Sequence, residues 1–184
     1  MSDDQKLNII DENGKIIGEE TRENIHRQGL LHREINVWFY TPAGEIIFQH
    51  RGKNKDTYPN LLDATVGGHV EIGSDYLDTA LKEIAEEAGI NVKASDLILL
   101  KTVKSKSQDQ ITGKINYKIQ AIFAYGYQEK IEDLLIEDGE ATGFEAIDLK
   151  KLLTMSEPDK EKFVPSIFSP SGLDVFKTIQ GLLQ

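Results

Sequence analysis

An amphipathic helix pattern between residues 75 and 88 constrains the fold of this chain more than any other feature. Its apolar residues recur at intervals of three and four, which places them on one stripe of a helix. They are Leu77, Ala80, Leu81, Ile84 and Ala88. Gly89 follows as a predicted C-cap. The pattern therefore predicts a helix over 75–88 that buries one face.

Strand-like segments surround this helix on both sides. Alternating and β-branched runs bounded by Gly, Pro and Asn predict hairpins and longer strands. The predicted strands span 7–10, 15–18, 35–40, 45–50, 97–104, 117–125 and 144–147, and two further helices span 148–153 and 173–183. Segment 19–29 is a short polar stretch, and 105–113 is a polar connection. The order predicts one mixed α and β domain over 1–184, with 1–6 as a disordered tail.

The length of 184 residues suits one domain of ordinary size. No apolar stretch approaches the roughly 18–20 residues of a membrane-spanning helix. The first residues lack the apolar segment of a signal peptide. We therefore expect a cytoplasmic protein that does not associate with membranes.

The net charge and the lack of cysteine limit which partners and which metals this chain is expected to bind. The 21 Lys and Arg against 31 Asp and Glu give a formal net charge of −10, which repels nucleic acid polymers. A small phosphorylated substrate then requires a cation or a local basic patch in its pocket. Because the chain has no cysteine, any metal must be held by carboxylates, imidazoles or carbonyls, which favours a hard cation.

Three carboxylates crowd one edge of the predicted helix. Glu83, Glu86 and Glu87 fall within a wedge of roughly 100° beside the apolar stripe. Like charges at this spacing destabilise an isolated helix by a few tenths of a kcal/mol per pair, so something should offset the repulsion. The two interpretations are a solvated charged face and a divalent-cation site. Gly67 and Gly68 precede the helix, and glycine lets a backbone carbonyl approach a cation closely.

These residues together resemble the Nudix box. The family pattern is a Gly, five residues, Glu, seven residues, Arg-Glu, an aliphatic, any residue, Glu-Glu, any residue, Gly and an aliphatic. The spacing is intact from Gly68 to Ile90. The resemblance implies a Nudix-type α/β/α sandwich with a mixed β-sheet and a Mg²⁺- or Mn²⁺-dependent hydrolase.

Two positions of the box depart from the family pattern. Ser74 stands where the family has Glu, and Lys82 where it has Arg. In the family these two side chains are thought to pair, so their joint change is interpreted as a replaced supporting contact. Ser74 is also a predicted helix N-cap, worth about 1 kcal/mol, and Asp75 adds a favourable charge in the first turn.

The resemblance also implies roles for single residues. Glu86 and Glu87 would coordinate the metal, the Gly67 carbonyl would add a ligand, and Glu83 would coordinate or orient a metal-bound water. Such a metal lowers the pKa of water and neutralises a diphosphate during attack on phosphorus.

A general base is still required. Nudix enzymes often take it from a late loop, and Glu140 is the first candidate, with Glu137 second. Both have an alternative interpretation as solvated residues of an acidic loop.

Beyond the box, the chain is most similar to the branch of the family that contains isopentenyl-diphosphate isomerase. His26, His32 and His69 lie near the positions of that enzyme's metal-binding histidines. Its catalytic cysteine is matched by Gly67, however, and its later acidic pair by Asn116 and Lys118. We therefore interpret His26 and His32 as structural residues rather than metal ligands. His69 remains either a donor to substrate or a structural residue.

Arg51 begins a loop with Lys53 and Lys55, which form the local basic group nearest the predicted site. Arg51 is the predicted phosphate contact, because a guanidinium binds phosphate oxygens in pairs. Trp38 and Tyr58 are aromatic candidates for stacking on a base, although Trp38 lies in a strand and favours the core.

The sequence thus predicts a metal-dependent pyrophosphohydrolase that acts on a nucleoside diphosphate linked to another moiety. The alternatives are a diphosphate isomerase and a non-catalytic module that senses a nucleotide. The sequence leaves open the substrate, the bond cleaved, the number of metals, and whether the chain forms a homodimer.

Overall fold

The N-terminal part of the chain forms a small two-stranded sheet. The computed structural model describes residues 4–55 and 57–183, and β1 (Lys6–Ile10) pairs antiparallel with β2 (Ile16–Thr21). The hairpin predicted over 7–18 is therefore confirmed. Of the predicted tail, residues 1–3 lie outside the described residues, whereas Lys6 begins β1 and Gln5 Nε2 donates a hydrogen bond to Glu71.

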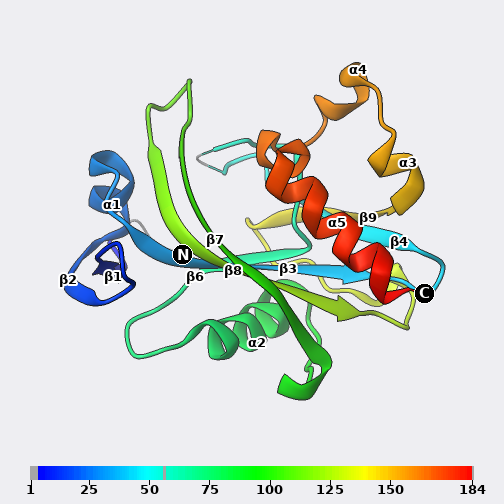
Figure 1. Ribbon diagram of the computed structural model, residues 1–184, viewed down its shortest axis with the longest axis horizontal. Coiled ribbons are helices and arrows are strands. Elements are labelled where there is room, and N and C mark those ends of the chain that lie inside the picture. Colours follow the sequence, from blue (N-terminus) through cyan, green and yellow to red (C-terminus); the bar gives the residue numbers. More distant parts are fainter. Residues whose placement is uncertain (1–3, 56, 184) are drawn as a thin grey trace.

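A seven-stranded sheet forms the centre of the molecule (Figure 1). Its strands are β3 (His32–Tyr40), β4 (Glu45–Arg51), β5 (Leu62–Asp63), β6 (Val66–His69), β7 (Leu97–Gln108), β8 (Ile115–Gly126) and β9 (Ala141–Asp148). The order is β5-β4-β3-β8-β7, with β6 paired to β3 and β9 to β4. The β3–β8 pair is parallel and the other pairs are antiparallel, so the sheet is mixed as predicted.

Helices cover both faces of this sheet. Figure 1 shows α2 (Tyr76–Glu87) against one face and α5 (Pro170–Leu182) against the other. Shorter elements complete the outer layers: α1 (Arg22–Gln28), α3 (Leu149–Leu153), α4 (Glu157–Lys160) and the 3₁₀ turns η1 (Ala94–Asp96), η2 (Ile131–Asp133) and η3 (Pro165–Phe168). The architecture is the predicted α/β/α sandwich. Within the described residues, no helix is both long and apolar enough to cross a lipid bilayer.

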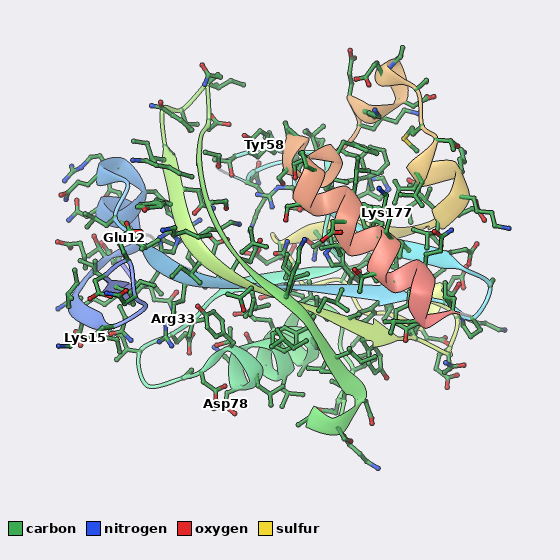
Figure 2. All side chains as sticks on the ribbon, viewed as in Figure 1. Glu12, Lys15, Arg33, Tyr58, Asp78 and Lys177 are labelled. Atoms are coloured by element: carbon green, nitrogen blue, oxygen red, sulfur yellow. The ribbon has the colours of Figure 1, made fainter. Side chains whose placement is uncertain are left out.

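The alternation of side chains along β3 divides the core into two layers. Val37 and Phe39 pack with Ile84 under α2, whereas Trp38 packs with Phe176 under α5. Figure 2 shows side chains filling the space between the sheet and these helices. Near the start of β3, the side chains on the face toward α5 are polar instead. This end of the sheet face can therefore form a polar site.

Several predicted boundaries need correction. Thr21 caps a helix, α1, inside the segment that the sequence left as a polar stretch. Strand β7 continues to Gln108, because residues 105–108 pair with β8 instead of forming the predicted connection. Asp75, not Ser74, caps α2: its side chain accepts a hydrogen bond from the Asp78 backbone N–H at 2.8 Å.

Candidate functional site

The three carboxylates of α2 do not share one environment. Glu83 and Glu87 are buried, with exposed fractions of 3% and 5%, whereas the Glu86 side chain is about half exposed, at 49%. The burial follows from the end of β6, which lies over this side of the helix. Two of the three predicted metal ligands therefore point inward.

Glycine allows the close approach of β6 to the helix. A Cβ atom at Gly68 would lie 2.5 Å from Glu83 Cδ, so the Glu83 carboxylate would have to move to make room for it. The Gly67 backbone N–H donates to Glu87 Oε2 at 3.3 Å, and Gln49 Nε2 donates to the same oxygen at 3.1 Å. The sequence Gly67-Gly68 thus places backbone directly against two carboxylates.

The electrostatics of this pair are unfavourable without a cation. Burial, and then repulsion by Glu86, raises the pKa of Glu83 to about 7. Burial, and then repulsion by Glu83, raises the pKa of Glu87 to about 8. Glu83 Oε1 is buried without a hydrogen-bond partner among the described residues. Buried, underpartnered carboxylate oxygens fit a hard divalent cation, so these residues fit the metal that the sequence predicts.

The acidic loop before β9 folds against the same region. Glu137 is close enough to repel Glu86 and Glu83, and Glu140 is close enough to repel Glu87. The loop is attached through Gly52, whose backbone N–H donates to the Glu140 carbonyl at 2.8 Å. We call Glu83, Glu86, Glu87, Glu137 and Glu140 the acidic site.

The two predicted bases have different environments. Burial opposes ionisation of Glu140, but a hydrogen bond and ion pair with Lys55 outweigh it and lower its pKa below the usual range. The pKa of Glu137 is raised, first by burial and then by Glu140 and Glu86. The Lys55 partner was not predicted, since 85 residues separate it from Glu140.

The altered box positions are explained by a neighbouring carboxylate. Lys82 Nζ lies 2.7 Å from Glu71 Oε1 and 3.8 Å from Glu86 Oε2. Glu71, three residues before Ser74, therefore supplies the carboxylate that pairs with the residue at position 82. The supporting contact is replaced, in agreement with the interpretation of the joint change.

Arg51 has protein partners in this structure. Its guanidinium donates to Asp63 Oδ2 at 2.9 Å and to the backbone carbonyls of Thr57 and Tyr58. It thereby holds the loop that carries Tyr58, whose φ of 51° is positive. Trp38 lies in the core, with 4% exposure, in keeping with its strand position.

A second polar cluster lies around β6 at His69. One ligand atom each from His26, His32, Glu34 and His69 lies within 4.8 Å of the others, and we call these residues the histidine cluster. His26 and His32, interpreted from the sequence as structural residues, are both buried and converge with His69. Glu34 was missed, although it shares a face of β3 with His32 and lies opposite His69 in β6.

Hydrogen bonds orient two of the rings. Nδ1 of His32 lies 3.0 Å from the Leu30 carbonyl, and Nδ1 of His26 lies 3.3 Å from the Ile115 carbonyl. Nε2 of each ring points into the cluster, where the tautomer decides whether it donates or accepts a hydrogen bond. His32 Nε2 lies 3.3 Å and His69 Nε2 3.4 Å from Glu34 Oε1.

Charge in the histidine cluster is balanced from within the chain. Burial lowers the pKa of His26 to about 4 and that of His69 well below its usual range. Burial would raise the pKa of Glu34, but Lys118 and the His32 hydrogen bond outweigh it, and that pKa lies well below its usual range. Lys118 Nζ is 2.5 Å from Glu34 Oε2.

Comparisons with known proteins agree with this fold. The NUDIX domain family matches residues 30–167. An uncharacterized Nudix hydrolase of Clostridium acetobutylicum is 29% identical over 153 residues, which cover 82% of this chain and 73% of that protein.

Solved structures share the fold at low sequence identity. DR0079 from Deinococcus radiodurans aligns with a TM-score of 0.72 at 17% identity, over 95% of this chain and 98% of that chain. The NUDIX domain of Shewanella oneidensis NrtR, solved with ADP ribose, aligns with a TM-score of 0.60 at 12% identity, over 84% and 89% of the two chains. The chain thus belongs to the NUDIX domain family and is a Nudix hydrolase, an enzyme that acts on pyrophosphate bonds.

Proposed function

We propose that this chain is a Mg²⁺- or Mn²⁺-dependent pyrophosphohydrolase acting on a nucleoside diphosphate linked to another moiety. The observation that carries the proposal is the pair of buried carboxylates, Glu83 and Glu87, packed against Gly67-Gly68 with Glu83 Oε1 unpartnered in the described part of the chain. Glu83, Glu86, Glu87 and the Gly67 carbonyl are the proposed metal ligands. Nudix hydrolases generally use divalent metals.

The reaction follows from the charges at this site. The bound cation would supply Lewis acidity and offset the negative charge of the diphosphate. The acidic site alone would repel that substrate, since its nearby basic residues, Arg51 and Lys55, already pair with carboxylates. Water attacks one phosphorus, the bond to the bridging oxygen breaks, and the water proton passes to a carboxylate of the chain.

Glu140 is our proposed acceptor of that proton. Its lowered pKa keeps it ionised at neutral pH, and its loop lies against the acidic site. Lys55 must release Glu140, or leave one oxygen available, for the carboxylate to meet the water. Glu137, with its raised pKa, is the second candidate.

Arg51 and His69 are the proposed substrate contacts. Arg51 lies where β4 meets the loop at 52–58, and the side chain of His69 is 13% exposed. Each has protein partners now, so each would exchange one of them for a phosphate or ribose oxygen.

Within the family, we infer that the chain is similar to the isopentenyl-diphosphate isomerase branch but lacks its catalytic cysteine, which Gly67 replaces. The assembled histidine cluster is the observation that favours isomerase as a second candidate. Incubation with isopentenyl diphosphate tests it directly, and formation of the isomer would overturn our assignment. A non-catalytic nucleotide sensor is the third candidate, and binding without turnover would support it.

The primary experiment measures phosphate or nucleoside monophosphate release from nucleoside di- and triphosphates, nucleotide sugars and dinucleoside polyphosphates with Mg²⁺. ADP ribose is a suitable first compound, because it is a nucleoside diphosphate linked to a second moiety. Turnover should require the cation and disappear in Glu87→Gln.

The cation should also raise the melting temperature of the wild type but not that of Glu87→Gln. Asp78→Asn, which removes one charge from an exposed position of α2, is the matched control and should keep both properties. Equal cation binding by the wild type and Glu83→Gln/Glu87→Gln would place the metal elsewhere.

A further inference from the structure

The histidine cluster has the parts of a transition-metal site. Three imidazoles and one carboxylate offer ligand atoms within 4.8 Å of one another. Backbone carbonyls hold His26 and His32 through Nδ1, an arrangement that fixes ring orientation in protein metal sites. Figure 1 places α1, which carries His26, beside the starts of β3 and β8.

The same cluster contains a cation that belongs to the chain. The register of the parallel β3–β8 pair places Lys118 opposite His32, and Gln120 opposite Glu34. Since side chains alternate along a strand, Asn116, Lys118 and Gln120 share one face. Lys118 Nζ lies on Glu34 Oε2, and Asn116 Nδ2 donates to Glu34 Oε1 at 2.9 Å.

Lys118 and Asn116 already bind the oxygens of Glu34, the carboxylate that a metal ion would need as a ligand. A metal ion binds the lone pairs of a carboxylate, whereas Glu34 receives hydrogen bonds or ion pairs at both of its oxygens. A divalent ion beside Glu34 would also lie close to the Lys118 ammonium and be repelled by it. The Lys118 side chain is only 18% exposed, so water screens this repulsion weakly.

We propose that the Lys118 ammonium takes the place of a metal ion in the histidine cluster, so that the wild-type cluster excludes transition metals and accepts one when the ammonium is removed. The residues present therefore do not fit the metal that resemblance to the isomerase implies. This proposal does not rest on the proposed hydrolase activity, because the acidic site contacts the other face of β6 and shares no residue with the cluster, although His69 is also a proposed substrate contact.

Cobalt(II) is the probe. Co²⁺ bound by imidazoles in four- or five-coordinate sites absorbs visible light more strongly than Co²⁺ surrounded by six oxygens, and excess Mg²⁺ keeps the oxygen ligands of the acidic site occupied. The wild type should show no strong absorption. Lys118→Met, which keeps chain length but removes charge, should show it, with at least tenfold tighter Co²⁺ binding. Lys118→Glu should bind as tightly or more tightly.

Two controls match these variants. Lys118→Arg keeps the positive charge and should show no strong cobalt absorption. Lys106→Met removes a lysine from an exposed position of β7 in the same hairpin, and it should also show no strong cobalt absorption. His32→Gln added to Lys118→Met should abolish the absorption, which assigns the signal to the cluster.

Strong cobalt absorption in the wild type that is lost in His32→Gln would overturn the proposal. Absence of strong absorption in folded Lys118→Met and Lys118→Glu would also overturn it. If neither variant folds, NMR of the wild-type imidazole resonances decides. Titration with Zn²⁺ under excess Mg²⁺ should leave the rings of His26, His32 and His69 unshifted, and shifts at these rings would contradict the proposal. Hydrolase activity enters neither measurement.

Discussion

The acidic site and the histidine cluster both lie at β6, and they shift the pKa of a buried carboxylate in opposite directions. Under α2, Glu83 and Glu87 lie against Gly67 and Gly68, and their pKa values are raised. On the other face of the strand, Glu34 is equally buried but contacts Lys118, and its pKa is lowered. Burial is common to both, so the difference comes from whether the chain supplies its own cation.

This difference separates a site that needs a ligand from one that does not. A buried negative charge without a partner costs free energy, which a bound cation recovers. A buried carboxylate with an ammonium and several hydrogen bonds is already satisfied, and removing either partner would leave a charge unpaired. Similar residue types in one small region therefore give two functions.

The largest expected effect concerns catalysis at the acidic site. Glu140→Gln should lower turnover by about 10²–10⁴-fold, the usual contribution of general base catalysis, while leaving the affinity of the first metal nearly unchanged. Glu137→Gln should have a smaller effect. Steady-state rates at saturating substrate and Mg²⁺ test this, and unchanged turnover in Glu140→Gln would return the role to the helix carboxylates, with Glu83 tested first.

Carboxylate-to-amide changes should have opposite effects on stability in the two regions. Glu34→Gln should lower the free energy of unfolding by about 3–5 kcal/mol, because it leaves the partly buried Lys118 ammonium unpaired. Glu87→Gln should raise it by about 1–3 kcal/mol in the metal-free protein above pH 8, because it removes an uncompensated charge. Urea unfolding of both variants in EDTA measures the two changes, and a shared sign would refute the comparison.

The pH dependence of stability should show the same contrast. Because the pKa values of Glu83 and Glu87 are about 7 and about 8, the folded protein retains protons that the unfolded chain releases above about 4.5. Their contribution to the free energy of unfolding therefore falls as pH rises from about 5 through about 8. The wild type should lose stability relative to metal-free Glu87→Gln over this range.

The contribution of Glu34 to the free energy of unfolding changes with pH in the opposite direction. Its lowered pKa means that its contribution is present above the unfolded value and is lost only as pH falls through acid. Thermal melts of wild type and Glu87→Gln between pH 5 and 9, in EDTA, isolate the acidic-site contribution. A constant difference across that range would show that Glu87 does not titrate there.

The smallest expected effect concerns the altered box positions. Ser74→Glu together with Lys82→Arg should leave metal binding intact and change activity less than tenfold, or about 1.4 kcal/mol in the barrier, because Glu71 already pairs with Lys82. Kinetic comparison with the wild type tests this. A gain of several orders of magnitude in turnover would instead identify the natural protein as a weakened enzyme or a sensor.

Local patterns predicted much of the architecture. The helix with Ile84 on its apolar stripe, the hairpin at 7–18 and five of the seven strands of the mixed sheet follow from periodicity and turn residues, which act over a few positions. The short strands β5 and β6 were not predicted. The box spacing from Gly68 to Ile90 likewise indicated the family. The extension of β7 to Gln108 was missed, because a polar edge-strand segment looks like a loop until its partner strand is known.

The sequence by itself determined which residues we propose as metal ligands, since Gly67, Glu83, Glu86 and Glu87 lie in one short strand and the helix that follows it. Tertiary structure alone decided which charges each carboxylate meets. Lys55 reaches Glu140 across 85 residues, and Lys118 reaches Glu34 across 84, through a parallel strand pairing. Whether a buried carboxylate binds an external cation or an internal one depends on such long-range contacts, because electrostatic energy follows distance and burial rather than position in the chain.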